Sequence, residues 1–114
     1  MPEGDTVYYA AQRLDAQLSG QVIIRSDFRI PSLATKDLSG ATVTATTSRG
    51  KHLLTRFDNG LTLRTHLKME GYWYVHPNGT RWRRPAHTAR VVLRTATTEA
   101  VGFSVVMDLS LIHI

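Results

Sequence analysis

The chain has 114 residues, which is enough for one domain with its own core and too few for two. Its 14 lysines and arginines outnumber 9 acidic residues, and 42% of its residues are hydrophobic, so it fits a folded protein with an anionic partner. The absence of cysteine excludes disulfides and thiolate metal sites within these residues, and no apolar run approaches the ~20 residues that span a bilayer. We therefore expect a cytoplasmic protein without a membrane partner, although a merely basic surface is the simpler account of the charge.

The first predicted element is an amphipathic helix over residues 5–18. Its apolar side chains recur in steps of four, three and four residues: Val7, Ala11, Leu14 and Leu18. Asp5 or Thr6 can cap the start of the helix, and Gly20 can end it. A rigid helix here would fix the direction of the residues that precede it.

The rest of the chain has the pattern of strands joined by short turns. Extended segments are predicted at residues 22–29, 41–48, 51–57, 61–68, 70–76, 87–94 and 100–106. Pro31 closes the first segment, and residues 32–40 form a connection with room for a short helical turn. Tight turns are predicted at Gly50, at residues 58–60 and at residues 77–79. One helix and about seven strands predict a mainly β fold with an N-terminal α-helix, either an antiparallel sandwich or a partly closed barrel.

The segment 61–68 has the clearest alternation. Leucines at positions 61, 63 and 67 share one face, and a basic row on the other face is predicted to point outward: Arg64, His66 and Lys68. A second basic segment, residues 81–85, surrounds Trp82 with arginines. This loop either contacts a phosphate backbone, which would make binding sensitive to salt, or is simply solvated.

The start of the chain carries a candidate nucleophile. If Met1 is removed, which the small side chain of Pro2 permits, the chain begins with a secondary amine next to the carboxylate of Glu3. A free α-amino group titrates at about pH 8 and a lysine at about 10.4, so more of this amine is unprotonated at neutral pH. Its addition to a sugar carbon yields an electron-withdrawing iminium, and Glu3 can act as general acid and base. Proline after methionine is also common, and an acidic residue suits any first helical turn.

Three segments in this order resemble the formamidopyrimidine-DNA glycosylase and endonuclease VIII family of base-excision repair enzymes. They are Pro2-Glu3-Gly4 before a helical pattern, Arg49-Gly50-Lys51-His52-Leu53-Leu54, and His66-Leu67-Lys68-Met69-Glu70-Gly71. The sequence of residues 3–7, Glu-Gly-Asp-Thr-Val, is more similar to the endonuclease VIII-like branch. The resemblance covers most of the chain up to residue 107 and implies the N-terminal domain of such a glycosylase.

The resemblance implies an enzyme that removes oxidised bases from damaged double-stranded DNA and then cuts the strand at the abasic site. In that family the N-terminal proline forms a Schiff base with the sugar of the damaged nucleotide. The adjacent glutamate is the acid and base, and the lysine of the Arg-Gly-Lys turn assists. The matching positions are Pro2, Glu3 and Lys51. A solvated lysine at a turn is the plain alternative for Lys51.

Candidate DNA contacts lie around the second and third segments and beyond them: Arg49, His66, Lys68, Met69 and His87. Met69 resembles the wedge residue that the family inserts where the damaged base has left the stack, although methionine is more often core filler. Residues 68–70 depart from the glutamine-leucine-tyrosine wedge frequent in endonuclease VIII, which leaves the preferred lesion open. A histidine on a strand is also an ordinary structural donor. No two histidines have a metal-binding spacing, so we expect no metal and no cofactor in these residues.

The sequence divides into an incomplete catalytic domain over residues 1–108 and a tail over residues 109–114. The tail, Leu-Ser-Leu-Ile-His-Ile, looks like translated transposon sequence joined to a gene fragment, and a native apolar strand is the alternative. Family members continue into a helix-two-turns-helix module and usually a zinc finger, so zinc is expected only in that further region. We expect a monomeric bacterial protein that associates with the nucleoid. A non-catalytic basic nucleic-acid-binding β module and an inactive fragment of the glycosylase are the alternatives.

Overall fold

The N-terminal helix forms as its apolar pattern predicts. A computed structural model describes residues 4–110, in which helix α1 spans Gly4–Leu18. The predicted stripe is buried, together with one further alanine: Val7, Ala10, Ala11, Leu14 and Leu18. Gly20 follows the helix with a φ of 81°, a left-handed conformation that glycine adopts without steric cost. The predicted helix and its end are therefore confirmed.

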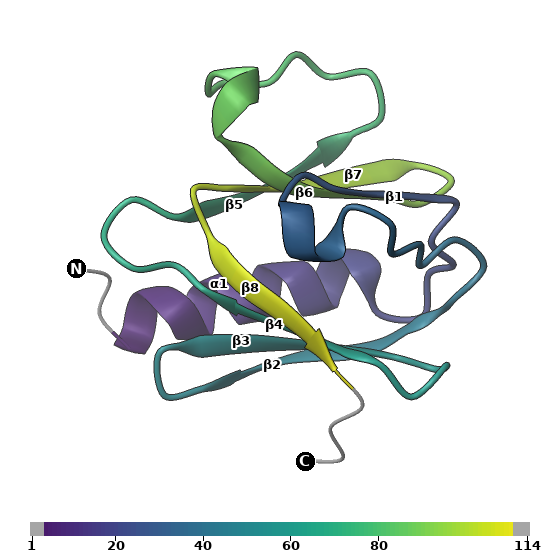
Figure 1. Cartoon of the computed structure of the whole chain (residues 1–114). Helices are drawn as coiled ribbons and strands as arrows, with labels where there is room; N and C mark the ends of the chain where they lie inside the picture. Colours follow the sequence, from purple (N-terminus) through teal and green to yellow (C-terminus); the bar gives the residue numbers. More distant parts are fainter. Residues whose placement is uncertain (1–3, 111–114) are drawn as a thin grey trace.

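The strands after the helix form two four-stranded antiparallel sheets. Within the described residues they are β1 (Arg25–Phe28), β2 (Val43–Arg49), β3 (His52–Phe57), β4 (Thr62–His66), β5 (Tyr72–Pro77), β6 (Ala89–Arg94), β7 (Thr98–Phe103) and β8 (Val106–Ser110). The first sheet has the order β1-β6-β7-β5 and the second the order β2-β3-β4-β8. The sheets form separate layers (Figure 1) and do not close into a barrel, so the sandwich is the correct alternative of the two predicted.

The main apolar core lies between the two sheets, and α1 closes one side of it. The helix packs chiefly against β2 and occupies the level between the sheets in Figure 1. Leucines from the helix and from both sheets are fully buried: Leu14, Leu18, Leu53, Leu63 and Leu93. Trp73 is also buried, and its Nε1–H donates to Thr65 Oγ1 at 3.2 Å, so its polar atom has a partner within the core.

The predicted strand over residues 22–29 is divided between two partners. Only β1 pairs with β6, whereas Val22 forms an isolated bridge with Thr42. Ile23 donates its backbone N–H to Ala41 O at 2.8 Å, next to that bridge. The chain thus pairs first beside the second sheet and then within the first sheet. The alternation of apolar and polar residues does not predict such a change of pairing partner.

The predicted strand over residues 100–106 is likewise divided. It ends at Phe103, and β8 then joins the other sheet beside β4. The cause is Ser104, which has a φ of 56° and donates its backbone N–H to Thr88 O at 2.8 Å. Leu109 and Ser110, placed by the sequence in a separate tail, belong to β8 and pair with β4. Residues 111–114 lie outside the described residues, and the origin of the tail stays a prediction.

Several residues assigned to strands lie in turns, including Lys51 and Glu70. His87 belongs to the 3-10 turn η2 (Ala86–Thr88), which Thr88 Oγ1 closes by donating to Pro85 O at 2.7 Å. Lys68 follows the end of β4 with a φ of 55°. The predicted basic row therefore keeps only Arg64 and His66 on the strand. A second 3-10 turn, η1 (Pro31–Leu33), occupies the predicted connection. No helix within residues 4–110 has both the length and the apolar character needed to cross a membrane.

Candidate nucleic-acid interface

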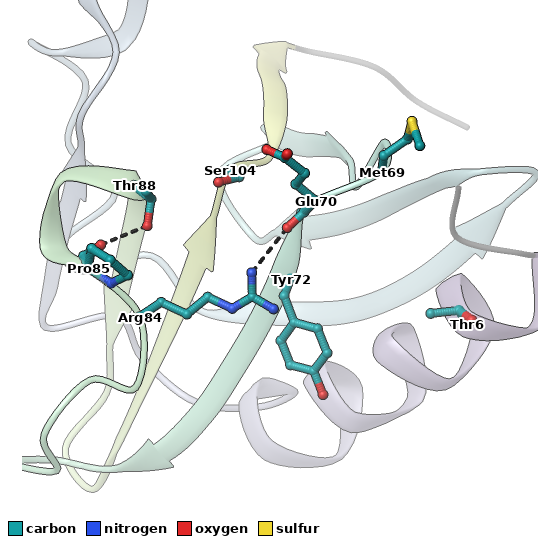
Figure 2. Close-up of a pocket in the computed structure, with 9 residues that line it drawn as sticks. Thr6, Met69, Glu70, Tyr72, Arg84, Pro85, Thr88 and Ser104 are labelled. Atoms are coloured by element: carbon teal, nitrogen blue, oxygen red, sulfur yellow. Dashed lines mark hydrogen bonds between the residues drawn. The ribbon is translucent and has the colours of Figure 1, made fainter.

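An open groove of about 740 Å³ lies at the start of α1. Figure 2 shows that its walls come from the first turn of α1, the β4–β5 loop, the segment before β6 and the turn after β7. The lining residues are Thr6, Met69, Glu70, Gly71, Tyr72, Arg84, Pro85, Thr88 and Ser104. Segments far apart in the sequence thus meet at the place where the chain begins its helix.

The β4–β5 loop is tightly wound, and its winding presents Met69. Gly71 donates its backbone N–H to Leu67 O at 2.7 Å, and a Cβ on Gly71 would lie 2.3 Å from the same oxygen, so only glycine fits. Lys68 donates its backbone N–H to His66 Nδ1 at 2.9 Å. Met69 stands between these two fixed points with 73% of its surface exposed, and its side chain points away from Arg84 and Tyr72 (Figure 2). The methionine is therefore not core filler.

Arg84 is a groove residue that the sequence analysis did not assign to the site. Its guanidinium lies over the ring of Tyr72 at 5.4 Å and over that of Tyr74 at 5.7 Å from the centroids. It also donates to Glu70 O at 3.3 Å, the dashed contact in Figure 2. A stacked cation in an open groove is suited to phosphates and to planar rings. The arginines on either side of Trp82 in the sequence indicated a phosphate-binding loop, but they did not indicate which arginine reaches the groove.

Hydrogen bonds to a buried carboxylate on the first sheet fix the segment that carries Arg84. Trp82 Nε1–H donates to Glu99 Oε1 at 2.9 Å, and Arg94 donates to Glu99 Oε2 at 2.6 Å. Glu99 is only 2% exposed. Burial opposes its ionisation, but the hydrogen bonds from Trp82 and Arg94 and the charges of Arg94 and His76 outweigh burial and hold the pKa of Glu99 below its usual value. Glu99 lies between the predicted strands 87–94 and 100–106, and nothing in the sequence around it indicated this role.

A basic cluster lies at the adjoining end of the second sheet. Arg49 ends β2 and Lys51 is in the β2–β3 turn, where Gly50 has a φ of 61° as the predicted turn requires. In the strand register Arg49 pairs with His52, and His52 pairs with His66. The order of these pairs places the cationic turn directly beside the end of β4, where Lys68 follows.

His66 is held neutral within this cluster. Burial and then the charges of His52, Lys68 and Lys51 lower the pKa of His66. The hydrogen bond that Nδ1 accepts from the Lys68 backbone assigns the ring proton to Nε2. His66 therefore offers a neutral N–H donor among cations, an arrangement suited to binding an anion such as phosphate.

The structure brings most of the predicted site residues to one side of the molecule. The start of α1, the β2–β3 turn with Lys51 and the β4–β5 loop with Met69 all lie on the left in Figure 1. His87 is exposed next to Thr88, which lines the groove. Pro2 and Glu3 lie outside the described residues, immediately before the helix whose Thr6 lines the groove. Their roles stay predictions.

The residues of the described range do not fit a zinc site. Within residues 4–110, no group of three or more histidines, cysteines, aspartates or glutamates could hold a metal ion. His52 and His66 face each other, but their rings meet edge to face at 4.8 Å between centroids, without an acidic residue to complete a ligand set.

Several proteins and solved structures are similar to this chain. A probable endonuclease 8 2 of Streptomyces coelicolor is 57% identical over 104 residues, which are 90% of this chain and 38% of the relative. The DNA-(apurinic or apyrimidinic site) lyase Nei2 of Mycolicibacterium smegmatis is 43% identical over all 114 residues and 42% of its own length. The chain thus spans about two fifths of the length of these relatives.

The fold has close counterparts among solved structures. Lactococcus lactis Fpg (MutM) in complex with DNA containing N7-benzyl-Fapy-dG superposes with a TM-score of 0.81 over 96% of this chain and 44% of that chain, at 21% identity. The sequence model of the formamidopyrimidine-DNA glycosylase N-terminal domain matches residues 1–106, nearly the whole chain. From this match and the two relatives, we conclude that the chain belongs to the formamidopyrimidine-DNA glycosylase and endonuclease VIII family.

Proposed function

We propose that this chain carries the catalytic end of a DNA glycosylase with abasic-site lyase activity, acting on oxidised bases in damaged double-stranded DNA. The nitrogen of Pro2 attacks the sugar C1′, and Glu3 protonates the ring oxygen as the C1′–O4′ bond opens. The base leaves with the proton given up by the Pro2 nitrogen, and an iminium joins Pro2 to the opened sugar. Loss of a C2′ proton then expels the 3′ phosphate by β-elimination, which cuts the strand.

The observation that carries this proposal is the groove at the start of α1. Thr6 lines it, so the chain enters the helix beside the groove and only a few residues after Pro2 and Glu3. A nucleophile held by a rigid helix retains the positional advantage of an intramolecular reaction. The names of the relatives, an endonuclease 8 and an abasic-site lyase, support the same reaction.

The other residues of the groove and cluster have roles in holding the DNA. Met69 would enter the stack in place of the damaged base and offset part of the few kcal/mol that base flipping costs. Lys51 would contact a phosphate near the lesion and assist proton transfer, and Arg49, His66 and Lys68 would bind the neighbouring backbone. His87, exposed beside the groove, is the further proposed DNA contact.

The cellular setting of the proposed reaction follows from the partner. The DNA complexes of Lactococcus lactis Fpg support binding to DNA, and the relatives are bacterial. We therefore place the protein in the bacterial cytoplasm, associated with the nucleoid and acting as a monomer. The proposed chemistry requires no cofactor from these residues, because the amine and the carboxylate supply the nucleophile and the proton.

Borohydride trapping tests the proposal. The chain, with removal of Met1 confirmed by mass spectrometry, is incubated with an abasic-site duplex and reductant, and a covalent protein–DNA adduct is expected because only an iminium is reduced to a stable amine. The matched control is the same chain with an uncleaved N-terminal extension, which blocks the Pro2 nitrogen and should give no adduct. Binding without any adduct would favour the non-catalytic β module, and a chain without cooperative unfolding would favour the inactive fragment.

A further inference from the structure

Six arginines gather on the outer face of the first sheet, away from the main core: Arg25, Arg29, Arg81, Arg83, Arg84 and Arg94. We call this set the outer arginine surface. It holds six of the 14 basic residues of the chain. Among the described residues, three acidic residues line the cavities around these arginines: Asp27, Glu99 and, in the groove with Arg84, Glu70. The surface is thus strongly positive, and it is distinct from the basic cluster on the second sheet.

Trp82 fixes the arginine-bearing segment on this face. Its ring meets that of Phe103 edge to face at 5.7 Å between centroids, and the guanidinium of Arg29 lies over it at 5.1 Å. Val92 and Val101 complete a small apolar cluster there, separate from the main core. The flanking residues Arg81 and Arg83 are therefore presented by an anchored segment, which reduces the entropy lost when they bind a ligand.

The six arginines fall into two groups. Three of them already have a partner within the protein. Arg29 forms an ion pair with Asp27 at 2.8 Å, Arg84 stacks on Tyr72, and Arg94 forms an ion pair with Glu99. Within the described residues the other three are exposed and form neither an ion pair nor a side-chain hydrogen bond: Arg25, Arg81 and Arg83. These three have their full donor sets available to an external anion.

The fold keeps this charge at a cost to its stability. Arg25 lies directly opposite Arg94 in the β1–β6 register, a placement of like charges that destabilises a sheet. Glu99 compensates Arg94, but no acidic residue of the described range compensates Arg25. Nothing in the packing requires an arginine at the exposed position 25, which points to an external partner of opposite charge.

The outer arginine surface is continuous with the groove. Arg84 lines the groove, Arg81 and Arg83 line a cavity of about 340 Å³ under the same segment, and a third cavity of about 110 Å³ lies between Trp82 and β1. We propose that this surface binds the phosphate backbone of the DNA that extends beyond the groove. The choice of DNA as the polyanion rests on the proposed function.

The test measures how binding to lesion-free DNA depends on salt. The duplex has about 20 base pairs, which at ~34 Å per ten pairs is roughly twice the 34 Å extent of the molecule. The slope of log affinity against log salt should fall by about 0.9 for each arginine that contacts a phosphate. The triple variant R25Q/R81Q/R83Q should therefore lose about 2.7 from the slope relative to the unaltered chain.

A charge-matched control separates local contact from net charge. The variant K36Q/R56Q removes two charges outside the outer arginine surface and should change the slope by less than a third as much as R81Q/R83Q. An equal change in the two variants would overturn the proposal, and so would a triple variant that loses binding to anionic phospholipid vesicles but keeps its slope on DNA. If the triple variant does not fold, R81Q/R83Q should lose about 1.8 from the slope, and no loss would overturn the proposal.

The result is distinguishable from a failure of the proposed chemistry. Borohydride trapping at saturating abasic-site DNA should be the same in the triple variant and in the unaltered chain, because the altered residues lie outside the groove. Absence of trapping in both proteins, with the difference in slope intact, would overturn the proposed reaction and leave the DNA-binding surface standing.

Discussion

The rings of His52 and His66 lie edge to face across β3 and β4, with centroids 4.8 Å apart. His66 Nδ1 is already occupied by the backbone N–H of Lys68. Protonation of His66 would place a further cation beside Lys51 and Lys68. Burial, and then the charges of His52, Lys68 and Lys51, therefore lower the pKa of His66. The neutral imidazole therefore limits the electrostatic repulsion within the basic cluster.

We expect His66 to titrate below its usual value of 6.5 in the free protein and to move upward when DNA binds, because phosphates offset the neighbouring cations. Its folded-state pKa lies below that of the unfolded chain, so as the pH falls below 6.5 the unfolded chain takes up the proton first and stability declines. Titration of the histidine ring signals by NMR, assigned with His66→Gln, measures this. A titration above the usual value in the free protein would contradict it.

The hydrogen bond from Trp82 to Glu99 should contribute measurably to stability. Trp82→Phe keeps an aromatic ring over Phe103 but leaves a buried carboxylate oxygen without its donor, at an expected cost of about 1–3 kcal/mol. Chemical denaturation measures the loss. Tyr9→Phe, on the exposed side of α1, is the control and should stay within about 0.5 kcal/mol of the unaltered chain.

Glu99 should make the protein sensitive to acid. Its pKa is lower in the folded state than its usual 4.5, so its contribution to stability is present above pH 4.5 and is lost as the pH falls below that value through the folded pKa. Glu99→Gln should be less stable at neutral pH and show a flatter decline of stability below pH 4.5. Glu70→Gln, at an exposed position, should keep the steep decline, and equal profiles for the two variants would contradict the assignment.

Gly71→Ala should disturb the loop that presents Met69. A Cβ 2.3 Å from Leu67 O cannot be accommodated without moving the backbone, so we expect a loss of about 1–3 kcal/mol in the free energy of unfolding. Thermal or chemical denaturation checks this value. Gly71→Ala with unchanged stability would show that the loop is less tightly wound than described.

Met69→Ala separates the wedge from the fold. Because the side chain is 73% exposed, its removal should change stability by no more than about 0.5 kcal/mol. Under the proposed function it should slow excision from a duplex while trapping on an already abasic site changes less, since no base has to be displaced there. A loss of about 2–5 kcal/mol in the free energy of unfolding, as expected for a buried methionine, would show that Met69 is a core residue.

The sequence predicted the elements whose causes are local. The stripe of α1 and the turns at Gly50 and Gly60 depend on residues within a few positions of each other, and all three are found where expected. The switch from β7 to β8 was not predictable in this way, because Ser104 adopts a positive φ to satisfy a hydrogen bond with the distant Thr88. Alternation identifies a strand and says little about the sheet it joins.

The candidate site divides in the same manner. Lys51 and Met69 were found because they stand in contiguous motifs, and the structure places them at neighbouring turns. Arg84 and Glu99 were missed because their roles arise from contacts with residues 12 to 17 positions away or on other strands, such as Tyr72 and Trp82. Only a three-dimensional arrangement shows that one arginine of the loop reaches the groove and that one acid holds the loop.

Ser104 lines the groove, and it also lies in the connection through which the chain passes from β7 in the first sheet to β8 in the second. The β4–β5 loop, which joins the second sheet to the first, lines the same groove, so two connections between the layers meet there. A ligand seated there would contact both of these connections at once.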